Sequence, residues 1–526
     1  MSELHYFKPE WVVPSDERLV VDVCIYGGSS AGVIAGVEAS RQGKSAVVLH
    51  PGKFVGGLTT GGLGWTDYGR KDVIGGLARE FYRHVGSHYA KEEELQFEPK
   101  VAAAVYDAML REHNVPVRLC QFLDRVEMDG KRIKAITLLG GLRVEARVFI
   151  DATYEGDLLA KAGVSYTVGR ESNDAYGETL NGIQMLPKHQ FSHPVDPYVK
   201  EGDPSSGLLP WIETEDLTQK TGQADKRVQA YCFRMCMTDD PSLKIDWEKP
   251  SGYDPLQYEL ARRWFNGEKD KYNEQIWADR PDQPAKFDAF PNRTPGGYRK
   301  TDTNNHGPVS SDFIGANWDW ADGCYELREN IFQAHVTYQK GLYWFMANGD
   351  IPERYRKAYQ TWGLARDEFT ETGHWPHTLY IREARRMVAD YVITEHDCRG
   401  TRRAEDSIAM GSYGMDSHNC TRFVKIENGK ARVLNEGDVQ LHGFPAYPIS
   451  YRSIVPRRGE CENLLVAVCL SSSHIAYGSA RMEPVFMALG QSAMMAAAIA
   501  IDDGIRVQDV NYDKLRKMMV DAGQVI

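Results

Sequence analysis

Two short apolar runs, separated by a glycine turn and a helical stretch, constrain the fold more than any other part of the chain. Val20 to Tyr26 (VVDVCIY) is rich in β-branched residues and stops at Gly27, and Ser45 to Leu49 (SAVVL) is a second run of the same kind. Ala31 to Gln42 between them holds small and helix-compatible residues. Strand, glycine turn, helix and strand within about thirty residues form a βαβ unit. The sequence therefore predicts an α/β fold with a parallel sheet.

The glycine turn occupies the position at which such units bind the phosphates of a dinucleotide. Gly27 suits the tight turn, and Gly32 lets the helix pack closely on the sheet, with the pyrophosphate at the helix N-terminus. Ser29 replaces the middle glycine of the G-x-G-x-x-G pattern, and His50 stands where an acidic residue usually receives the ribose hydroxyls. The alternative is a glycine turn that binds nothing. We expect dinucleotide contacts from Gly27, Ser29, Ser30, Ala31, Gly32 and His50.

Three further segments are expected at the same ligand. Gly56 to Asp67 (GGLTTGGLGWTD) has so many glycines that its backbone is expected to run close to a ligand, and the stretch from Gly52 to Gly64 is expected to form no regular element. Ile150 to Asp157 (IDATYEGD) ends a predicted strand, and Ser471 to Pro484 leads into the last long helix. The expected cofactor contacts are Gly56, Gly57, Leu58, Thr59, Gly61, Gly62, Leu63, Gly64, Ala152, Thr153, Asp157, Arg481 and Met482.

Taken together, these segments give the chain a resemblance to a known family. It resembles the FAD-dependent oxidoreductases of the glutathione-reductase-like superfamily, in the branch marked by a GGLTxGGLG segment. The resemblance implies FAD as cofactor and a Rossmann-type FAD-binding domain, with the last long helix aimed at the flavin. The matching pieces are Gly27 to Gly32, Gly56 to Asp67, IDATYEGD with Gly169 to Glu171, Arg234, Lys300 to Asn305, Tyr380 to Met387, Asp416 to His418, and Ser473 to Gly490.

The composition changes along the chain and suggests a division into domains. Residues 19–174 and 451–526 carry the βαβ signals and are predicted to form two parts of one FAD-binding domain. Residues 175–450 are rich in Trp, Tyr, Asp, Asn and Pro and are predicted to form a large inserted α+β substrate domain. Val485 to Ile501 is apolar but interrupted by polar and glycine residues, so we expect a buried helix and no membrane span.

Charge and cysteine content exclude several classes of protein. The chain has 62 Lys and Arg against 73 Asp and Glu, a formal charge of −11 without a basic block, which disfavours nucleic acid as a partner. Its start, MSELHYFKPEW, lacks the pattern of a secretory signal. The nine scattered cysteines lack iron–sulfur spacing, and we expect reduced, mostly buried thiols in a cytoplasmic protein. No metal site is expected, and a homo-oligomer is left open.

The resemblance implies hydride transfer to flavin N5 from a CH–OH or CH–NH group, which requires a base near the flavin. His474 is the first candidate, because it lies in the loop expected at the flavin; the alternative is a purely structural hydrogen bond. Asp416 and His418 would share a face if residues 415–419 are extended. They would then form a catalytic pair or a polar pair that closes a loop.

Candidate substrate contacts come from polar and aromatic residues of the predicted inserted domain. Arg382, Arg385 and Arg386 fall on a predicted helix over 380–387, where they would share a face and bind an anion or form ion pairs with acids such as Glu383. With 11 Trp and 27 Tyr, an aromatic pocket for a sugar, glycoside or polyol is one interpretation, and ordinary core is the other. The expected substrate contacts are Asn304, Asn305, Arg382 and Tyr413.

Three functions compete at this stage. The first is a dehydrogenase or oxidase acting on a polar small molecule. The second is an RNA-modifying flavoprotein, which the negative charge disfavours. The third is a non-catalytic FAD-binding scaffold. Because GGLTTGGLG contains neither His nor Cys, non-covalent FAD is expected, while the substrate and the electron acceptor stay open.

Overall fold

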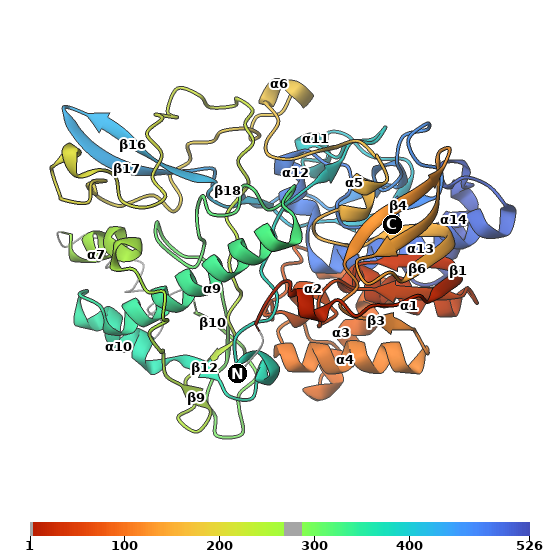
Figure 1. Cartoon of the computed structure of the whole chain (residues 1–526), viewed down its shortest axis with the longest axis horizontal. Helices are drawn as coiled ribbons and strands as arrows, with labels where there is room; N and C mark the ends of the chain where they lie inside the picture. The colour runs from red at the N-terminus through yellow and green to blue at the C-terminus, as the bar shows by residue number, and fades with distance from the viewer. Residues whose placement is uncertain (1–3, 268–286) are drawn as a thin grey trace.

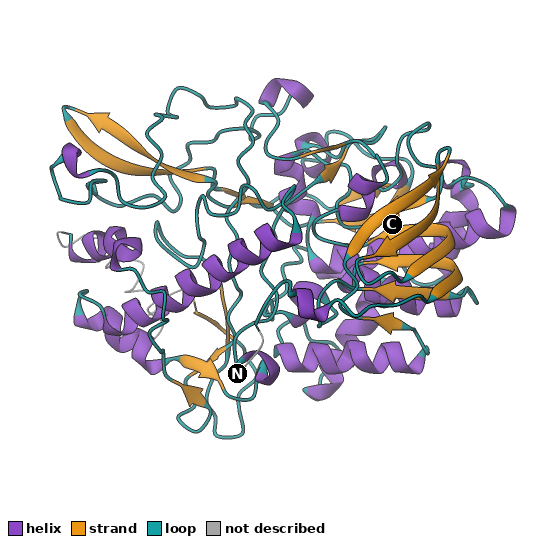
Figure 2. Cartoon of the chain, viewed as in Figure 1, coloured by secondary structure: helices purple, strands orange, loops and turns teal. Residues whose placement is uncertain are grey.

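The computed structural model describes residues 4–267 and 287–526 of the chain. Figure 1 shows two regions side by side: one built on a sheet that contains β1 and β6, and one crossed by the long helix α9 (Tyr325–Asn348). Figure 2 shows that most of the strands gather in the first region, whereas long loops make up much of the second.

The sheet of the first region has five parallel strands in the order β3-β2-β1-β6-β20. A meander of two strands, β4 and β5, continues it antiparallel to β6. The N-terminal part of β6 pairs with β5 at residues 143–145, and its C-terminal part pairs with β20 at residues 149–151. The bounds are β1 Arg18–Tyr26, β2 Ala46–Leu49, β3 Val117–Arg118, β4 Leu123–Asp129, β5 Arg132–Leu138, β6 Arg143–Asp151 and β20 Leu464–Val466.

Alternation along the strands divides the core between the two faces of the sheet. Val23 and Ile25 of β1 pack with α1 (Ser30–Arg41) and α13 (Glu483–Asp503), whereas Cys24 and Tyr26 pack on the other face. Helices α1 and α13 approach closely, because a Cβ on Gly490 would lie only 2.2 Å from the Ala31 carbonyl oxygen. Helix α13 is long and apolar enough to cross a membrane, but 94% of its most apolar window is buried, as in a core helix.

The second region is built from helices, short strand pairs and loops, and two large aromatic-rich clusters form its core. Other helices of the chain are α2 Gly57–Thr60, α3 Gly76–His88, α4 Pro99–Glu112, α5 Asp157–Lys161, α6 Asn173–Tyr176, α7 Glu259–Asn266, α10 Glu353–Thr361, α11 Glu395–Cys398, α12 His474–Ala480 and α14 Tyr512–Asp521. Other strands are β7 Tyr166–Thr167, β8 Met237–Thr238, β9 Lys244–Ile245, β10 Phe287–Ala289, β11 Thr301–Thr303, β12 Gly363–Ala365, β13 Arg386–Met387, β14 Ser407–Gly411, β15 Met415–Ser417, β16 Thr421–Glu427, β17 Lys430–Glu436, β18 Val439–Leu441 and β19 Tyr447–Ser450.

The predicted βαβ unit and the strand at 143–151 are confirmed in this fold. The division at residue 450 stays a prediction, and one hydrophobic cluster contains residues from both sides of it: Ile393, Ile408 and Ile449 pack with Ile25 and α13. All nine cysteines are free thiols, and only Cys324 is fully exposed.

Two local predictions are wrong. The predicted helix over 380–387 is an extended passage that ends in β13, which pairs with β7. Its arginines point to different acids across the molecule, so tertiary ion pairs override their helical spacing. The segment expected to hold no regular element contains one helical turn, α2, which begins after Gly56 in a left-handed conformation (φ 97°).

Candidate cofactor and active site

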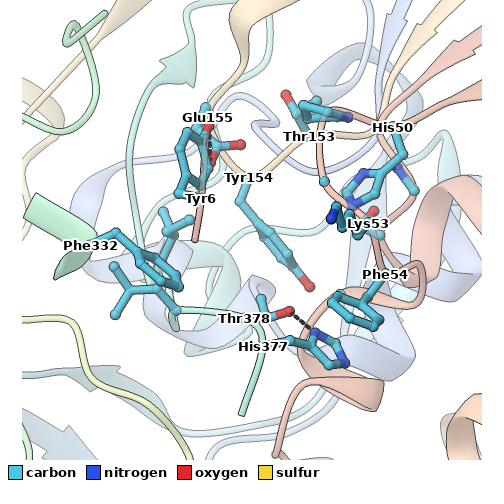
Figure 3. A pocket seen from close by; sticks show the side chains of 18 of the residues that line it. Tyr6, His50, Lys53, Phe54, Thr153, Tyr154, Glu155, Phe332, His377 and Thr378 are labelled. Atoms are coloured by element: carbon cyan, nitrogen blue, oxygen red, sulfur yellow. Dashed lines mark hydrogen bonds between the residues drawn. The ribbon is translucent and has the colours of Figure 1, made fainter. Parts of the chain in front are cut away.

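The carboxyl ends of β1, β2 and β6 open into a cavity with about 730 Å³ of space, part of which is open to solvent. Figure 3 shows Tyr154 in the middle of the cavity, with Tyr6, Glu155 and Phe332 on one side and His50, Lys53 and Phe54 on the other. The cavity therefore lies where a Rossmann-type sheet binds its dinucleotide.

The glycine turn has the geometry that the sequence predicted. Gly27 has a φ of 113°, and a Cβ on it would lie 2.4 Å from the backbone of Ala152. A Cβ on Gly32 would lie 1.9 Å from the Gly27 carbonyl oxygen. Ser29 caps α1 and donates a hydrogen bond to the Ala152 carbonyl (2.6 Å), so the serine that replaces glycine ties the turn to β6. The turn leaves the N-terminus of α1 facing the cavity, which fits a pyrophosphate.

His50 is held at the end of β2 as a neutral imidazole. Its Nδ1 accepts a hydrogen bond from the Gly28 N–H (3.0 Å), and burial lowers the pKa of His50 to about 4. His377 stacks on Phe54 with ring centres 4.3 Å apart, and burial lowers the pKa of His377 to about 3. Figure 3 shows this stack at the rim of the cavity. The rim therefore carries two imidazoles that are neutral at physiological pH.

A buried carboxylate that the sequence reading missed lies behind the turn. Glu483, at the start of α13, accepts hydrogen bonds from Ser30 (2.5 Å), Thr59 (2.9 Å) and Tyr154 (2.7 Å). The Tyr154 hydroxyl also accepts a hydrogen bond from the Leu58 N–H (2.9 Å). These contacts bring α1, the glycine-rich segment, the IDATYEGD segment and α13 to one point. Burial raises the pKa of Glu483, against the three hydrogen bonds, so its proton is held more tightly than usual.

Some of the predicted cofactor residues line the cavity, and the others pack behind its lining. Gly57, Ala152 and Thr153 line the cavity together with Gly27, Ser29 and His50. The other glycines of the GGLTTGGLG segment serve close packing: a Cβ on Gly62 would lie 2.1 Å from the Arg234 carbonyl oxygen. Gly56, Gly61, Leu63 and Gly64 are likewise outside the lining, and so are Ser30, Ala31, Gly32, Leu58, Thr59, Arg481 and Met482.

Asp157, an expected cofactor contact, forms ion pairs with arginines instead of lining the cavity. Both of its carboxylate oxygens are bound by Arg328 of α9 (2.7 and 2.8 Å), and Arg385 adds a third contact at 2.8 Å. The preceding acid, Glu155, lines the cavity instead, and burial raises its pKa to about 7. Asp157 therefore joins the sheet region to the second region and leaves the cavity to Glu155.

The N-terminal segment supplies lining that no sequence signal indicated. His5, Tyr6 and Trp11 lie in the cavity wall, although they precede β1. Trp11 lies beneath the Lys53 ammonium group, 4.2 Å from the ring centre. The apolar pattern of residues 4–11 (LHYFKPEW) could have indicated a packed segment, but nothing in it points to a ligand.

A second group of functional residues surrounds the ring of Tyr380, which belongs to one cluster with Leu58 and Leu63 of the glycine-rich segment. The guanidinium carbon of Arg382 lies 4.4 Å from the ring centre, that of Arg481 5.4 Å and that of Arg234 5.8 Å. Arg481 also donates hydrogen bonds to the Tyr380 hydroxyl (2.5 Å) and to the Asp416 carbonyl (3.0 Å). The polar cluster defined by Tyr380 and these three arginines thus adjoins the cofactor segment.

His418 and Asp416 lie together in this polar cluster, as predicted from an extended segment. Residues 415–417 form β15, and His418 Nε2 lies 3.7 Å from Asp416 Oδ1. The stronger partner was not predicted: His418 Nδ1 is 2.6 Å from Asp312, which also accepts a hydrogen bond from Arg382 (3.0 Å). Burial would raise the pKa of Asp416, but His418 and then Arg481 outweigh it and hold the pKa below its usual range. Asp416 therefore stays ionised.

His474 is bound at both ring nitrogens. Nδ1 lies 2.7 Å from Glu383 Oε2, and Nε2 lies 3.0 Å from Ser417 Oγ. Burial would raise the pKa of Glu383, but His474 and then Arg386 outweigh it and lower the pKa to about 2. His474 itself is 2% exposed. Its geometry therefore matches the alternative interpretation, a structural hydrogen bond to a buried group.

Four residues of the KTDTNN segment, in β11 and on either side of it, bind side chains from other parts of the chain. Asp302 binds Arg234 through two hydrogen bonds, Asn304 accepts one from Arg382 (2.9 Å), and Asn305 contacts His189 (3.4 Å). The Lys300 ammonium group binds three carboxylates at 2.7–2.8 Å; these are Glu98, Asp367 and Glu368. The three acids lie close enough together to hold a metal ion, but the ammonium groups of Lys300 and Lys100 already bind them.

A second cavity, with about 470 Å³ of space, begins at Asn304. One end is polar, with Thr303, Asn304, Ser310 and Ser311, and the other is aromatic. Of the predicted substrate residues, Asn304 lines this cavity, and Arg382 lies behind it. Asn305 is outside the lining, and Tyr413 lies elsewhere, with its hydroxyl 3.1 Å from Asp67. The aromatic walls are Trp264, Phe265, Tyr343 and Tyr359.

Solved structures similar to this chain are flavoproteins, although the overlaps are partial. They include a flavin-containing monooxygenase from Stenotrophomonas maltophilia (21% identity, 32% of this chain and 45% of that chain, TM-score 0.20). The 3-ketosteroid-delta4-(5alpha)-dehydrogenase from Rhodococcus jostii RHA1 is 15% identical over 27% of this chain and 48% of that chain, with a TM-score of 0.20. L-proline dehydrogenase from P. horikoshii is 14% identical over 30% of this chain and 59% of that chain, with a TM-score of 0.24. The match thus spans about half the length of these proteins, and the fold assignment rests on the strand order of the chain itself.

The match to a protein family is far more extensive. No curated protein matches the chain. The family model described as FAD dependent oxidoreductase, however, matches residues 22–519, which include both parts of the sheet and everything between them. The chain therefore belongs to the FAD-dependent oxidoreductase family, and FAD is its cofactor.

Proposed function

We propose that this protein is a dehydrogenase or oxidase that removes a hydride from a CH–OH or CH–NH group of a polar small molecule, with a sugar, glycoside or polyol as the preferred class. When bound, FAD supplies the hydride acceptor. The observation that carries the proposal is the Asp312–His418 pair, which lies in the polar cluster beside the cofactor segment and behind the second cavity.

We assign the role of base to His418 in preference to His474. A carboxylate on Nδ1 fixes the tautomer and orientation of an imidazole and leaves Nε2 to accept a proton. His418 has this arrangement, because Asp312 binds Nδ1 and the nearest acid to Nε2, Asp416, stays 3.7 Å away, beyond hydrogen-bond distance. His474 has partners at both nitrogens, and the Ser417 hydroxyl already occupies its Nε2.

Two carboxylates lie beside the imidazole of His418. Asp312 lies 2.6 Å from its Nδ1, and Asp416 lies 3.7 Å from its Nε2. Burial would raise the pKa of Asp312, but Arg382 and His418 outweigh it and hold the pKa low, so Asp312 is an anion when His418 takes up the proton. The pair therefore binds the proton without an internal transfer to the carboxyl group.

The second cavity supports a polyol or sugar as substrate. Aromatic faces pack on C–H surfaces, and amide and hydroxyl groups bond sugar hydroxyls. The cavity offers both, with Trp264 and Tyr343 on its walls and Asn304 and Ser311 at its polar end.

The test begins with an absorbance spectrum of the purified protein. An anaerobic panel of sugars, glycosides, polyols and amino compounds is then followed at the flavin band. Bleaching by one class supports the proposal and identifies the substrate class. A flavin-loaded protein that no member of the panel bleaches would contradict the substrate class, and a protein that cannot be loaded with FAD would contradict the cofactor site itself.

A further inference from the structure

The N-terminal segment from His5 to Trp11 forms part of the wall of the dinucleotide cavity, although it lies outside the βαβ unit. His5, Tyr6 and Trp11 line the same cavity as the glycine turn. We propose that this segment is a clasp that holds the adenosine half of FAD, with Glu329 of α9 as its positioning residue. The inference depends on the cofactor and not on the proposed substrate.

The clasp has a defined anchor on the second region. The carboxylate of Glu329 lies 2.6 Å from His5 Nδ1 and accepts hydrogen bonds from the backbone N–H groups of Tyr6 (2.7 Å) and Phe7 (3.0 Å). Next along α9, Gln333 donates to the Leu4 carbonyl (2.8 Å). These bonds hold the backbone of Leu4, Tyr6 and Phe7 and the side chain of His5, which a loosely attached terminus would not show.

Position in the fold assigns the clasp to the adenosine half. In a Rossmann-type unit the ribose lies at the end of the second strand, here His50, and the pyrophosphate lies at the glycine turn. Trp11 shares the cavity with residues 50–54, and its ring lies 4.2 Å from the Lys53 ammonium group. The ring is therefore on the β2 side of the pyrophosphate site.

The side chains suit an adenosine. A purine base stacks on aromatic rings through its face, independently of the hydrogen-bonding groups on its edge. Trp11 and the stacked pair Phe54 and His377 offer such rings around the β2 end of the cavity. At the other end, the Tyr6 hydroxyl donates to Glu155 (3.2 Å), which joins the clasp to the segment after β6. The clasp thus spans the cavity from β2 to β6.

The test compares nucleotide binding by the apoprotein of the wild type, Trp11→Ala and Glu329→Ala. ADP serves as the probe of the adenosine half, and FAD as the whole cofactor. Loss of a stacking ring costs about 1–3 kcal/mol per base, so Trp11→Ala should weaken both ADP and FAD by about tenfold to a hundredfold. Glu329→Ala should change both in the same direction. Glu326→Ala, an exposed position on the same helix, is the matched control and should bind like the wild type.

Several outcomes would overturn the clasp. Unchanged ADP affinity in both variants would do so, and weaker FAD binding with unchanged ADP binding would move the segment to the flavin half. Because Trp11 also packs on Phe7 and Phe122, Trp11→Phe separates binding from folding. It keeps a stacking ring and should recover most of the ADP affinity; ADP affinity that followed the melting temperature instead would show a structural role only. A wild type that binds neither nucleotide would contradict the cofactor site.

Discussion

The dinucleotide cavity and the polar cluster around Tyr380 lie next to each other but are built in opposite ways. Few charges line the cavity, and two of its histidines, His50 and His377, are neutral because burial lowers their pKa values. The polar cluster holds buried arginines and aspartates in pairs, and there charge is retained by a partner of the opposite sign. One region is shaped by close backbone packing, and the other holds its buried charges in pairs.

This difference also decides how each region tolerates change. In the cavity, an added atom collides with backbone that cannot move. In the polar cluster, a removed atom leaves a buried charge without its partner. Additions should therefore damage the first region most, and deletions the second.

The largest effect is expected from Gly32→Ala. The new Cβ would lie 1.9 Å from the Gly27 carbonyl oxygen, so the turn must open, and the purified variant should retain no flavin. The absorbance spectrum measures this directly. Gly43→Ala is the control: no atom lies within 4 Å of the added Cβ, so the variant carries only the strain of a left-handed backbone (φ 65°) and should stay yellow. A Gly32→Ala protein fully loaded with FAD would refute the role assigned to the turn.

Removal of the proposed base should come next in size. His418→Ala should slow anaerobic flavin reduction by about 10²- to 10⁴-fold, the usual contribution of general base catalysis. His474→Ala leaves Glu383 without its imidazole and should lower the free energy of unfolding, but it should slow reduction by less than about tenfold. Stopped-flow absorbance at saturating substrate measures both rates. The opposite order of the two rates would transfer the role of base to His474.

A deletion of charge in the polar cluster should cost stability rather than rate alone. Asp302→Ala leaves the Arg234 guanidinium, which is 3% exposed, without its two hydrogen bonds. The expected loss is about 3–5 kcal/mol in the free energy of unfolding. Urea denaturation followed by circular dichroism measures it. Glu353→Gln, which breaks an exposed pair with Lys357, should cost less than about 1 kcal/mol, and equal losses would contradict the comparison.

The smallest effect, counted per pH unit, concerns the pH dependence of the free energy of unfolding of the apoprotein. Because the pKa values of His50 and His377 are lowered to about 4 and about 3, the unfolded chain binds more protons than the folded one between about pH 4 and 6.5. The free energy of unfolding should therefore fall as the pH falls through this window, by at most about 1.4 kcal/mol per pH unit for each residue.

Replacement of one rim histidine isolates its share of that slope. His377→Phe keeps a ring against Phe54 and should flatten the slope, whereas His88→Gln, on the exposed end of α3, should leave it unchanged. Chemical denaturation at several pH values provides the measurement. A slope that His377→Phe does not alter would mean that His377 titrates normally in the folded protein.

The cofactor half could be predicted from the sequence because its signals are local. Gly27 and Gly32 are required by backbone contacts within a single βαβ unit, so their spacing alone identified the turn. The alternation at residues 415–419 likewise placed Asp416 and His418 on one face. Both predictions depended on residues that lie within a few positions of each other.

The rest depended on long-range contacts that no spacing reveals. Asp312 reaches His418 across 106 positions, and Glu483 reaches Ser30 across 453. The arginines at 382–386 have helical spacing, but each is drawn to a separate acid from a distant segment, so the local pattern predicted the wrong element. Tyr6 and Trp11 joined the cavity only because α9 anchors their segment.

The pairing of β6 with strands from distant parts of the sequence has a consequence for folding during synthesis. The C-terminal part of β6 meets one neighbour, β1, early in synthesis, but its other neighbour, β20, begins only at Leu464. Chains fold as they emerge, N-terminal residues first. On the ribosome, the backbone of residues 149–151 is therefore an open sheet edge throughout the synthesis of the second region, a state in which edges invite aggregation. The sheet can close only after β20 has been made, and helix α13 begins later still, at Glu483. A chain that stops before Leu464 should therefore aggregate without ever turning yellow.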